Sequence, residues 1–177
     1  MLNKTRHGFF TIVLWAGVIG AFLAMAPLNG AAKAAALTTF KTLSPELALK
    51  LAQETLKACR EGGYQVAVSV VDRSGILQVT LRDQLAGMHT PETARRKAWT
   101  AVSFRTDTMV MEENTKAGLP QSGVRFVADA LMAGGGVPVE ANGAIVGGVG
   151  VSGAPGGDLD DKCARAGIEA IIEDLEF

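Results

Sequence analysis

The sequence predicts an α+β domain in which an antiparallel β-sheet packs against helices. Two predicted β-hairpins support this fold class. In the first, the valine-rich residues 65–72 form one strand, and residues 76–83, in which apolar and polar residues alternate, form the other. The second covers residues 137–153 and turns at Asn142 and Gly143. Helical patterns flank both hairpins, and the sequence contains no strand–helix–strand repeat of the kind that builds a parallel sheet. The 177 residues suit one ordinary domain.

The longer helices are expected where a capping residue precedes a proline. Ser44 and Pro45 begin the first helix, which runs to a glycine pair at residues 62–63, and Thr90 and Pro91 begin the second. In both segments apolar residues follow at helical spacing, so each helix has one face to bury.

The remaining elements are less regular. Residues 107–117 predict a short third helix, and 119–136 an irregular stretch with a short strand or turn near 126–132. A last helix is expected after the second hairpin, with Asp158 as its N-cap.

The N-terminus has the three parts of a cleavable signal peptide. Two basic residues precede an uncharged, almost wholly apolar run over 9–28, and residues 32–34 fit the A-x-A cleavage rule. We therefore expect residues 1–34 to be removed and 35–177 to form a single periplasmic or secreted domain. The alternative is an uncleaved membrane anchor, because about 20 apolar residues could just span a bilayer.

The charge and cysteine content limit the partners. The formal net charge is −1, and no basic stretch indicates nucleic-acid binding. After signal cleavage nothing else in the sequence predicts a membrane segment. Cys59 and Cys163 fall among apolar residues of predicted helices, so we expect two free, slowly reactive thiols, although an exported compartment permits a disulfide.

Residues 148–153 match the pattern G-x-G-x-x-G, but their context does not suit a dinucleotide. That motif should follow the first strand of a β-α-β unit, whereas here it lies in the last predicted strand. We interpret it as a glycine-bearing strand against which another backbone or a flat ligand packs.

One segment could bind a cofactor. His89 is the single histidine left after signal cleavage, which argues against a serine triad, and no catalytic residue is predicted. The imidazole of His89 could ligate iron, with Met88 as a second possible ligand. Three cations on the adjoining helix, Arg95, Arg96 and Lys97, could pair with carboxylates such as haem propionates. The alternatives are an exposed loop histidine, and a Lys97 that points at the sheet and packs through its stem.

Several segments together resemble the GlcG/HbpS-like haem-binding family, which also occurs as the C-terminal domain of PduO-type proteins. The resemblance covers about residues 43–175 and is carried by VAVSVVDRSG (66–75), Arg82 and Asp83, ARRKAWTAVSF (94–104), GGGVPVEANGAIVGGVGVSG (134–153) and DDKCARAG (160–167).

The resemblance implies a profilin-like fold, an antiparallel sheet flanked by helices on both faces, and a homo-oligomer. It also implies binding of haem or a related tetrapyrrole and, in some members, haem degradation. Because this fold places the terminal helices on the same side of the sheet, a bond between Cys59 and Cys163 is the alternative to free thiols.

Three functions therefore stand as hypotheses. The first is an exported haem-binding carrier or sensor accessory, with His89, Arg96 and Lys97 as cofactor-binding residues and His89 as the iron ligand. The second is an enzyme that degrades haem or acts on a small metabolite, and the third is an oligomeric interaction module without a cofactor. We favour binding over catalysis because acid–base and nucleophilic groups do not converge in the sequence.

Overall fold

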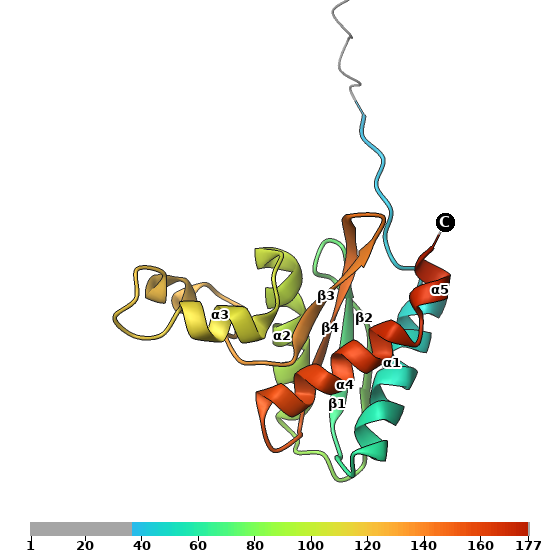
Figure 1. Ribbon diagram of the computed structural model, residues 1–177, viewed down its shortest axis with the longest axis horizontal. Coiled ribbons are helices and arrows are strands. Elements are labelled where there is room, and N and C mark those ends of the chain that lie inside the picture. Colours follow the sequence, from blue (N-terminus) through green and yellow to red (C-terminus); the bar gives the residue numbers. More distant parts are fainter. Residues whose placement is uncertain (1–36, 177) are drawn as a thin grey trace, which may run out of the picture. The chain divides into compact units, whose positions relative to one another are not determined.

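The computed structural model describes residues 37–176, so the predicted signal peptide lies outside the described residues. Residues from 39 onward form one compact unit. Its centre is a four-stranded antiparallel sheet in the order β2-β1-β4-β3 (Figure 1). The strands are β1 (Ala67–Asp72), β2 (Leu77–Arg82), β3 (Gly136–Ala141) and β4 (Ala144–Ser152).

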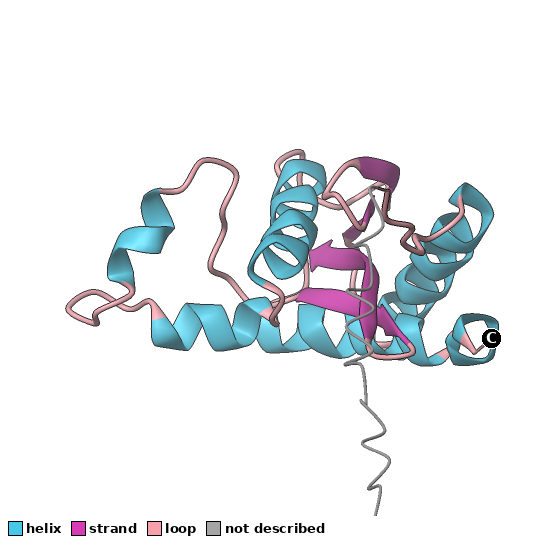
Figure 2. Ribbon diagram, turned by 90° about the horizontal axis from the view of Figure 1, so that it is seen from above, coloured by secondary structure: helices cyan, strands magenta, loops and turns pink. Residues whose placement is uncertain are grey.

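Helices cover both faces of the sheet, as Figure 2 shows from above. One face packs against α1 (Pro45–Glu61) and α4 (Gly157–Glu169), which the short α5 (Ile172–Leu175) follows. The other face packs against α2 (Thr90–Phe104). The predicted α+β class and the layered arrangement are therefore confirmed.

A projecting segment, here called the arm, comprises residues 107–134 (Figure 1). It contains α3 (Thr108–Asn114) and the 3-10 helix η1 (Ser122–Phe126), and of the strand or turn expected near residues 126–132 the structure has the turn, directly after η1. Met111, Ala130 and Met132 are buried and pack with α2, which anchors the base of the arm.

The alternation of side chains along the strands sorts the core into two layers. Val68 and Val70 of β1, with Val149 and Val151 of β4, are fully buried on the side of α1 and α4. On the opposite side Val71 packs against α2 in a smaller cluster. Because most buried apolar side chains lie on the first side, that layer supplies most of the hydrophobic stabilisation.

The glycines of β4 let α2 lie against the sheet backbone. A Cβ at Gly150 would be 2.0 Å from the Ala94 carbonyl oxygen, and one at Gly148 would be 2.6 Å from a methyl group of Val102. Gly148 and Gly150 of the G-x-G-x-x-G pattern thus form a helix-packing surface, because only hydrogen side chains leave room for the helix, whereas a Cβ at Gly153 would meet the backbone of Gln65 and Val66. The sequence left open whether another backbone or a flat ligand packs against these glycines, and in the structure the backbone of α2 does so.

Cys59 of α1 and Cys163 of α4 form a disulfide, with their Cα atoms 5.2 Å apart. The prediction of two free thiols is therefore wrong. The two helices lie side by side on one face of the sheet (Figure 1), and both cysteines point into their shared interface. Sequence periodicity places each cysteine on a buried face but does not pair the two helices.

The start of α4 also differs from expectation. Its N-cap is Gly156, and Asp158 lies within the first turn and is not the cap. The acids of this turn still lie where the helix dipole favours negative charge. In the part of the chain from 37 to 176, no helix is both long and apolar enough to cross a bilayer.

Candidate functional site

His89 lies on the surface immediately before α2. Thr90 anchors this helix start, since its hydroxyl donates to the Gly87 carbonyl at 2.8 Å, and Pro91 occupies the first turn. The His89 carbonyl accepts hydrogen bonds from the backbone amide and the hydroxyl of Thr93. The His89 ring is exposed and lies against Gly87. Its backbone is therefore fixed while its imidazole remains open to a ligand.

Met88 is the most exposed apolar residue beside this histidine. Its side chain is 94% exposed, and neighbouring Leu85 is 78% exposed. The thioether that the sequence suggests as a second iron ligand is thus accessible.

Arg95 and Arg96 connect α2 to the end of the arm. Arg95 forms two hydrogen bonds with Glu92 and one of 2.6 Å with the Asp129 carboxylate. These bonds from Arg95 hold the pKa of Glu92 below its ordinary value. Arg96 donates to the carbonyl oxygens of Ala130 at 2.7 Å and Asp129 at 3.3 Å. Both arginines therefore have protein partners that an external carboxylate would have to replace.

Lys97 points into the protein. Its side chain is 5% exposed, and its ammonium donates to the Asp160 carboxylate at 2.8 Å and to the Val151 carbonyl at 2.9 Å. Burial raises the pKa of Asp160, against the opposing attraction of Lys97. A bond of 3.0 Å from the Ala154 amide completes the environment of this carboxylate. Of the two roles considered from sequence, the geometry favours the structural one.

The structure brings two of the three predicted cofactor residues to the same surface. His89 and Arg96 are seven residues apart, about two helical turns, and so share a side of α2. Lys97 lies on the stripe of Ala94 and Ala101 that faces the sheet. Among residues 37–176, no three histidine, cysteine or acidic side chains cluster as a metal site.

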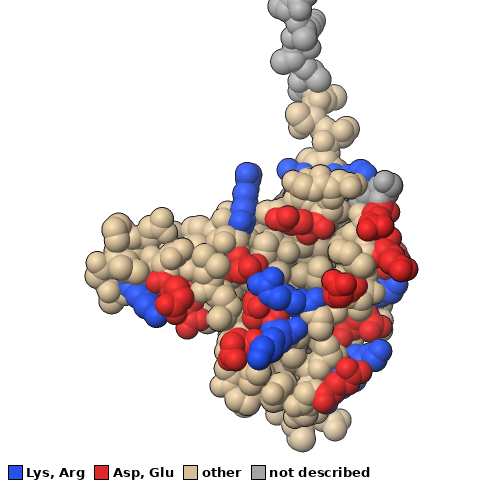
Figure 3. All heavy atoms as spheres, viewed as in Figure 1, with Lys and Arg blue, Asp and Glu red and all other residues tan. Residues whose placement is uncertain are grey.

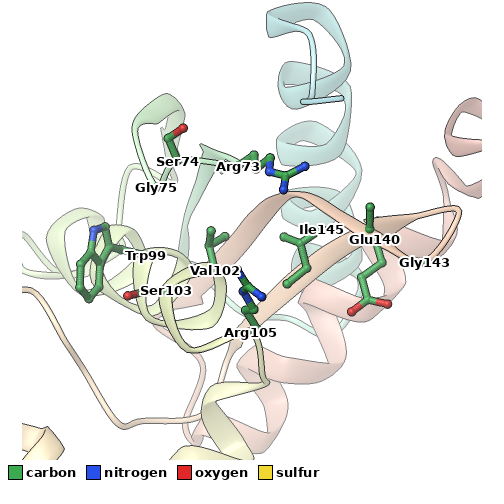
Figure 4. Close-up of a pocket in the computed structure, with 11 residues that line it drawn as sticks. Arg73, Ser74, Gly75, Trp99, Val102, Ser103, Arg105, Glu140, Gly143 and Ile145 are labelled. Atoms are coloured by element: carbon green, nitrogen blue, oxygen red, sulfur yellow. The ribbon is translucent and has the colours of Figure 1, made fainter. Parts of the chain in front are cut away.

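A pocket that the sequence did not indicate lies at the opposite end of α2. It has a volume of about 580 Å³ and opens where the β1–β2 turn, the end of α2 and the β3–β4 hairpin meet (Figure 4). The turn and the hairpin were predicted, but their approach to the helix end depends on the sheet order. Its lining residues are Arg73, Ser74, Gly75, Trp99, Val102, Ser103, Arg105, Glu140, Gly143, Ala144 and Ile145.

The fold defines a class of small α+β domains in which helices cover both faces of a four-stranded antiparallel sheet. The family of haem-degrading proteins described as HbpS-like matches residues 43–169. The chain therefore belongs to the HbpS-like family.

Solved structures agree with this assignment. A crystal structure of HbpS is 40% identical, with a TM-score of 0.72, over 77% of this chain and 94% of the other. A PduOC–haem complex is 30% identical, with a TM-score of 0.69, over 73% of this chain and 95% of the other. The Klebsiella pneumoniae protein ORFY is 26% identical, with a TM-score of 0.74, over 77% and 95% of the two chains.

Curated relatives match one part of a longer protein. The corrinoid adenosyltransferase PduO of Citrobacter freundii is 30% identical over 145 residues, which is 77% of this chain and 43% of the relative. The Salmonella typhimurium PduO is 30% identical over 124 residues, or 69% of this chain and 37% of the relative. This chain thus spans less than half the length of these relatives.

Proposed function

We propose that this protein is an exported haem-binding protein that acts as a carrier or sensor accessory. The observation that carries the proposal is the likeness to the PduOC–haem complex, over 73% of this chain and 95% of that one. Haem binding is the activity common to that complex and to the family to which this chain belongs.

The described residues fit a haem in part. The exposed imidazole of His89 would hold the iron, with Met88 as the alternative ligand, and Arg96 would meet a propionate in place of the carbonyl oxygens of Asp129 and Ala130. Lys97 does not fit this role, because its ammonium is buried with Asp160. When bound, haem would supply a redox-active iron, and the protein would position it and control its exposure.

Export and assembly are part of the proposal. The signal-like N-terminus and the Cys59–Cys163 disulfide support an oxidising, periplasmic or secreted location. A homo-oligomer is supported by the arm, where Phe126 is 90% exposed. On the face seen in Figure 3, charged side chains are interspersed over α1 and α4, whereas the outer arm is mostly uncharged.

Titration of the purified protein with haemin tests the function. We expect a saturable Soret change at about one haem per chain, and His89→Ala should shift the band and weaken binding. Gln84→Ala, at an exposed position of the same loop, is the matched control. No saturable change in the wild type would contradict the function. An unchanged His89→Ala titration would contradict the site alone and direct attention to Met88.

Haem degradation is the second candidate, favoured by the description of the matching family. Adding a reductant to the haem-loaded protein in air-saturated buffer separates the two functions, because ring opening consumes dioxygen together with electrons from the reductant. After unbound haem has been removed, a carrier keeps its Soret band, whereas a degrading enzyme loses the band and yields ring-opened products.

Export is tested on protein taken from the native cell envelope. Mass spectrometry should show an N-terminus near Ala35 and a Cys59–Cys163 peptide pair under non-reducing conditions. An intact Met1 on membrane-bound protein would support the anchor alternative.

A further inference from the structure

The pocket at the end of α2 holds two arginines that form no salt bridge within residues 37–176. Arg73 comes from the β1–β2 turn and Arg105 from the end of α2, and Figure 4 shows both guanidinium groups beside Ile145. Arg73 also lies over the Phe40 ring, 4.8 Å from its centroid. Two like charges from distant segments thus converge on one concave surface.

The backbone at Arg105 is unusual for a residue with a side chain. It ends α2 in the left-handed conformation, with φ 55° and ψ 41°, where glycine or asparagine is the common choice. Holding a bulky residue there costs free energy, and such strained positions cluster at functional sites. The backbone conformation of Arg105 therefore indicates a functional role for its side chain, which lines the pocket.

The other walls suit a flat apolar body. Trp99 forms one wall, and its indole packs so closely on Gly75 that a Cβ there would be 3.0 Å from the ring. Val102 and Ile145 provide aliphatic surface. Glu140 is the one acidic lining residue, so with Arg73 and Arg105 the pocket keeps a net positive charge.

The residues that line the pocket do not suit haem, the cofactor considered for His89. None of them is a histidine, cysteine, methionine or tyrosine, so the pocket offers no customary haem-iron ligand. Its lining residues on α2 run from Trp99 to Arg105, about 15–24 Å along the helix axis from His89. The two surfaces are therefore separate.

We propose that this pocket binds a small organic acid, with its carboxylate between Arg73 and Arg105 and its flat apolar body against Val102 and Ile145, toward the wall that Trp99 forms. Guanidinium groups recognise carboxylates through paired, charge-assisted hydrogen bonds, and their planes suit such ligands better than an ammonium does. The hydroxyls of Ser74 and Ser103 offer further polar contacts at the rim. This site goes beyond haem binding and does not depend on it.

Phenylacetate is the probe for the test, because it combines one carboxylate with one flat ring. The chain contains two tryptophans, so Trp15→Phe in the full chain leaves Trp99 as the sole tryptophan, which is excited selectively at a wavelength where tyrosine does not absorb. Phenylacetate should change this emission saturably, and phenylacetamide, which lacks the charge, should bind at least about tenfold more weakly.

Two variants test the arginines. Arg105→Asn suits the left-handed backbone and should leave the melting temperature unchanged or higher, while it weakens phenylacetate binding about tenfold. Arg73→Gln should weaken binding similarly. Lys162→Gln, an exposed change of the same charge on α4, is the control and should bind as the wild type does.

Three results would overturn the proposal. They are no saturable emission change in the parent protein, equal binding of phenylacetamide and phenylacetate, and an Arg105→Asn variant that binds phenylacetate as well as its parent. Haemin titration of Arg105→Asn keeps this test distinct from the haem proposal. Its Soret response should match the wild type, whatever the phenylacetate result.

Discussion

The ammonium of Lys97 lies 2.8 Å from the carboxylate of Asp160, and both side chains are 5% exposed. This ion pair joins α2 to α4 beside the end of the central strand β4, because Lys97 also donates to the Val151 carbonyl. Breaking a buried pair by removing one partner leaves an uncompensated charge in the interior.

Lys97→Ala should therefore lower the free energy of unfolding by about 3–5 kcal/mol, as measured by chemical denaturation. Haemin affinity, measured at a temperature where the variant is folded, should change little. Lys162→Ala removes an exposed cation and should alter stability by less than about 0.5 kcal/mol. A stable Lys97→Ala protein with weakened haemin binding would restore Lys97 as a cofactor residue.

The same pair predicts a pH dependence. Burial raises the pKa of Asp160 above the ordinary 3.8, so just above that pH the folded state holds a proton that the unfolded chain has lost. The folded state then binds more protons, and the contribution of this carboxyl to stability falls as pH rises from 3.8 through the raised pKa.

The free energy of unfolding of the wild type and of Asp160→Asn can be measured by chemical denaturation from about pH 3.5 to about pH 6. The difference between the two slopes of this free energy against pH gives the contribution of Asp160. The free energy of unfolding of the wild type should fall relative to that of the variant as pH rises. A relative rise would mean that Lys97 outweighs burial and lowers the pKa of Asp160.

The disulfide should account for a large share of stability. It closes a loop with a sequence separation of 104 between Cys59 and Cys163, and a loop of that length predicts about 4–5 kcal/mol from restriction of the unfolded chain. Reduction with dithiothreitol should lower the denaturation midpoint accordingly. The double variant Cys59→Ala, Cys163→Ala should be insensitive to reductant, which separates loss of the bond from other effects of the reagent.

The contact between β4 and α2 predicts the effect of a single methyl group. Gly150→Ala places its Cβ within 2.0 Å of the Ala94 carbonyl, so the helix must move, at a cost of about 3 kcal/mol. Gly123→Ala, where a Cβ meets nothing within 4 Å, is the matched control. Equal stability of the two variants would contradict the close approach of α2 to the sheet.

The sequence by itself determined the local elements of this protein. Ser44 caps α1 before Pro45 as expected, and α2 also begins where expected, although its N-cap is His89 and Thr90 is its first residue and not its cap. Asn142 and Gly143, both at positive φ, form the tight turn expected of the second hairpin. These signals depend on neighbours a few residues apart, so short-range sterics and hydrogen bonding are enough to produce them.

Only the tertiary structure decided which distant segments meet. Cys59 and Cys163 are bonded because α1 and α4 pack together, and the periodicity of either helix contains no information about the other. Lys97 lies on the alanine stripe of α2, which is a local signal for burial, but its acidic partner comes from α4. Arg73 and Arg105 form one pocket because the sheet order brings their elements together. Such relations depend on long-range packing, in which buried area and shape over the whole domain select the partners.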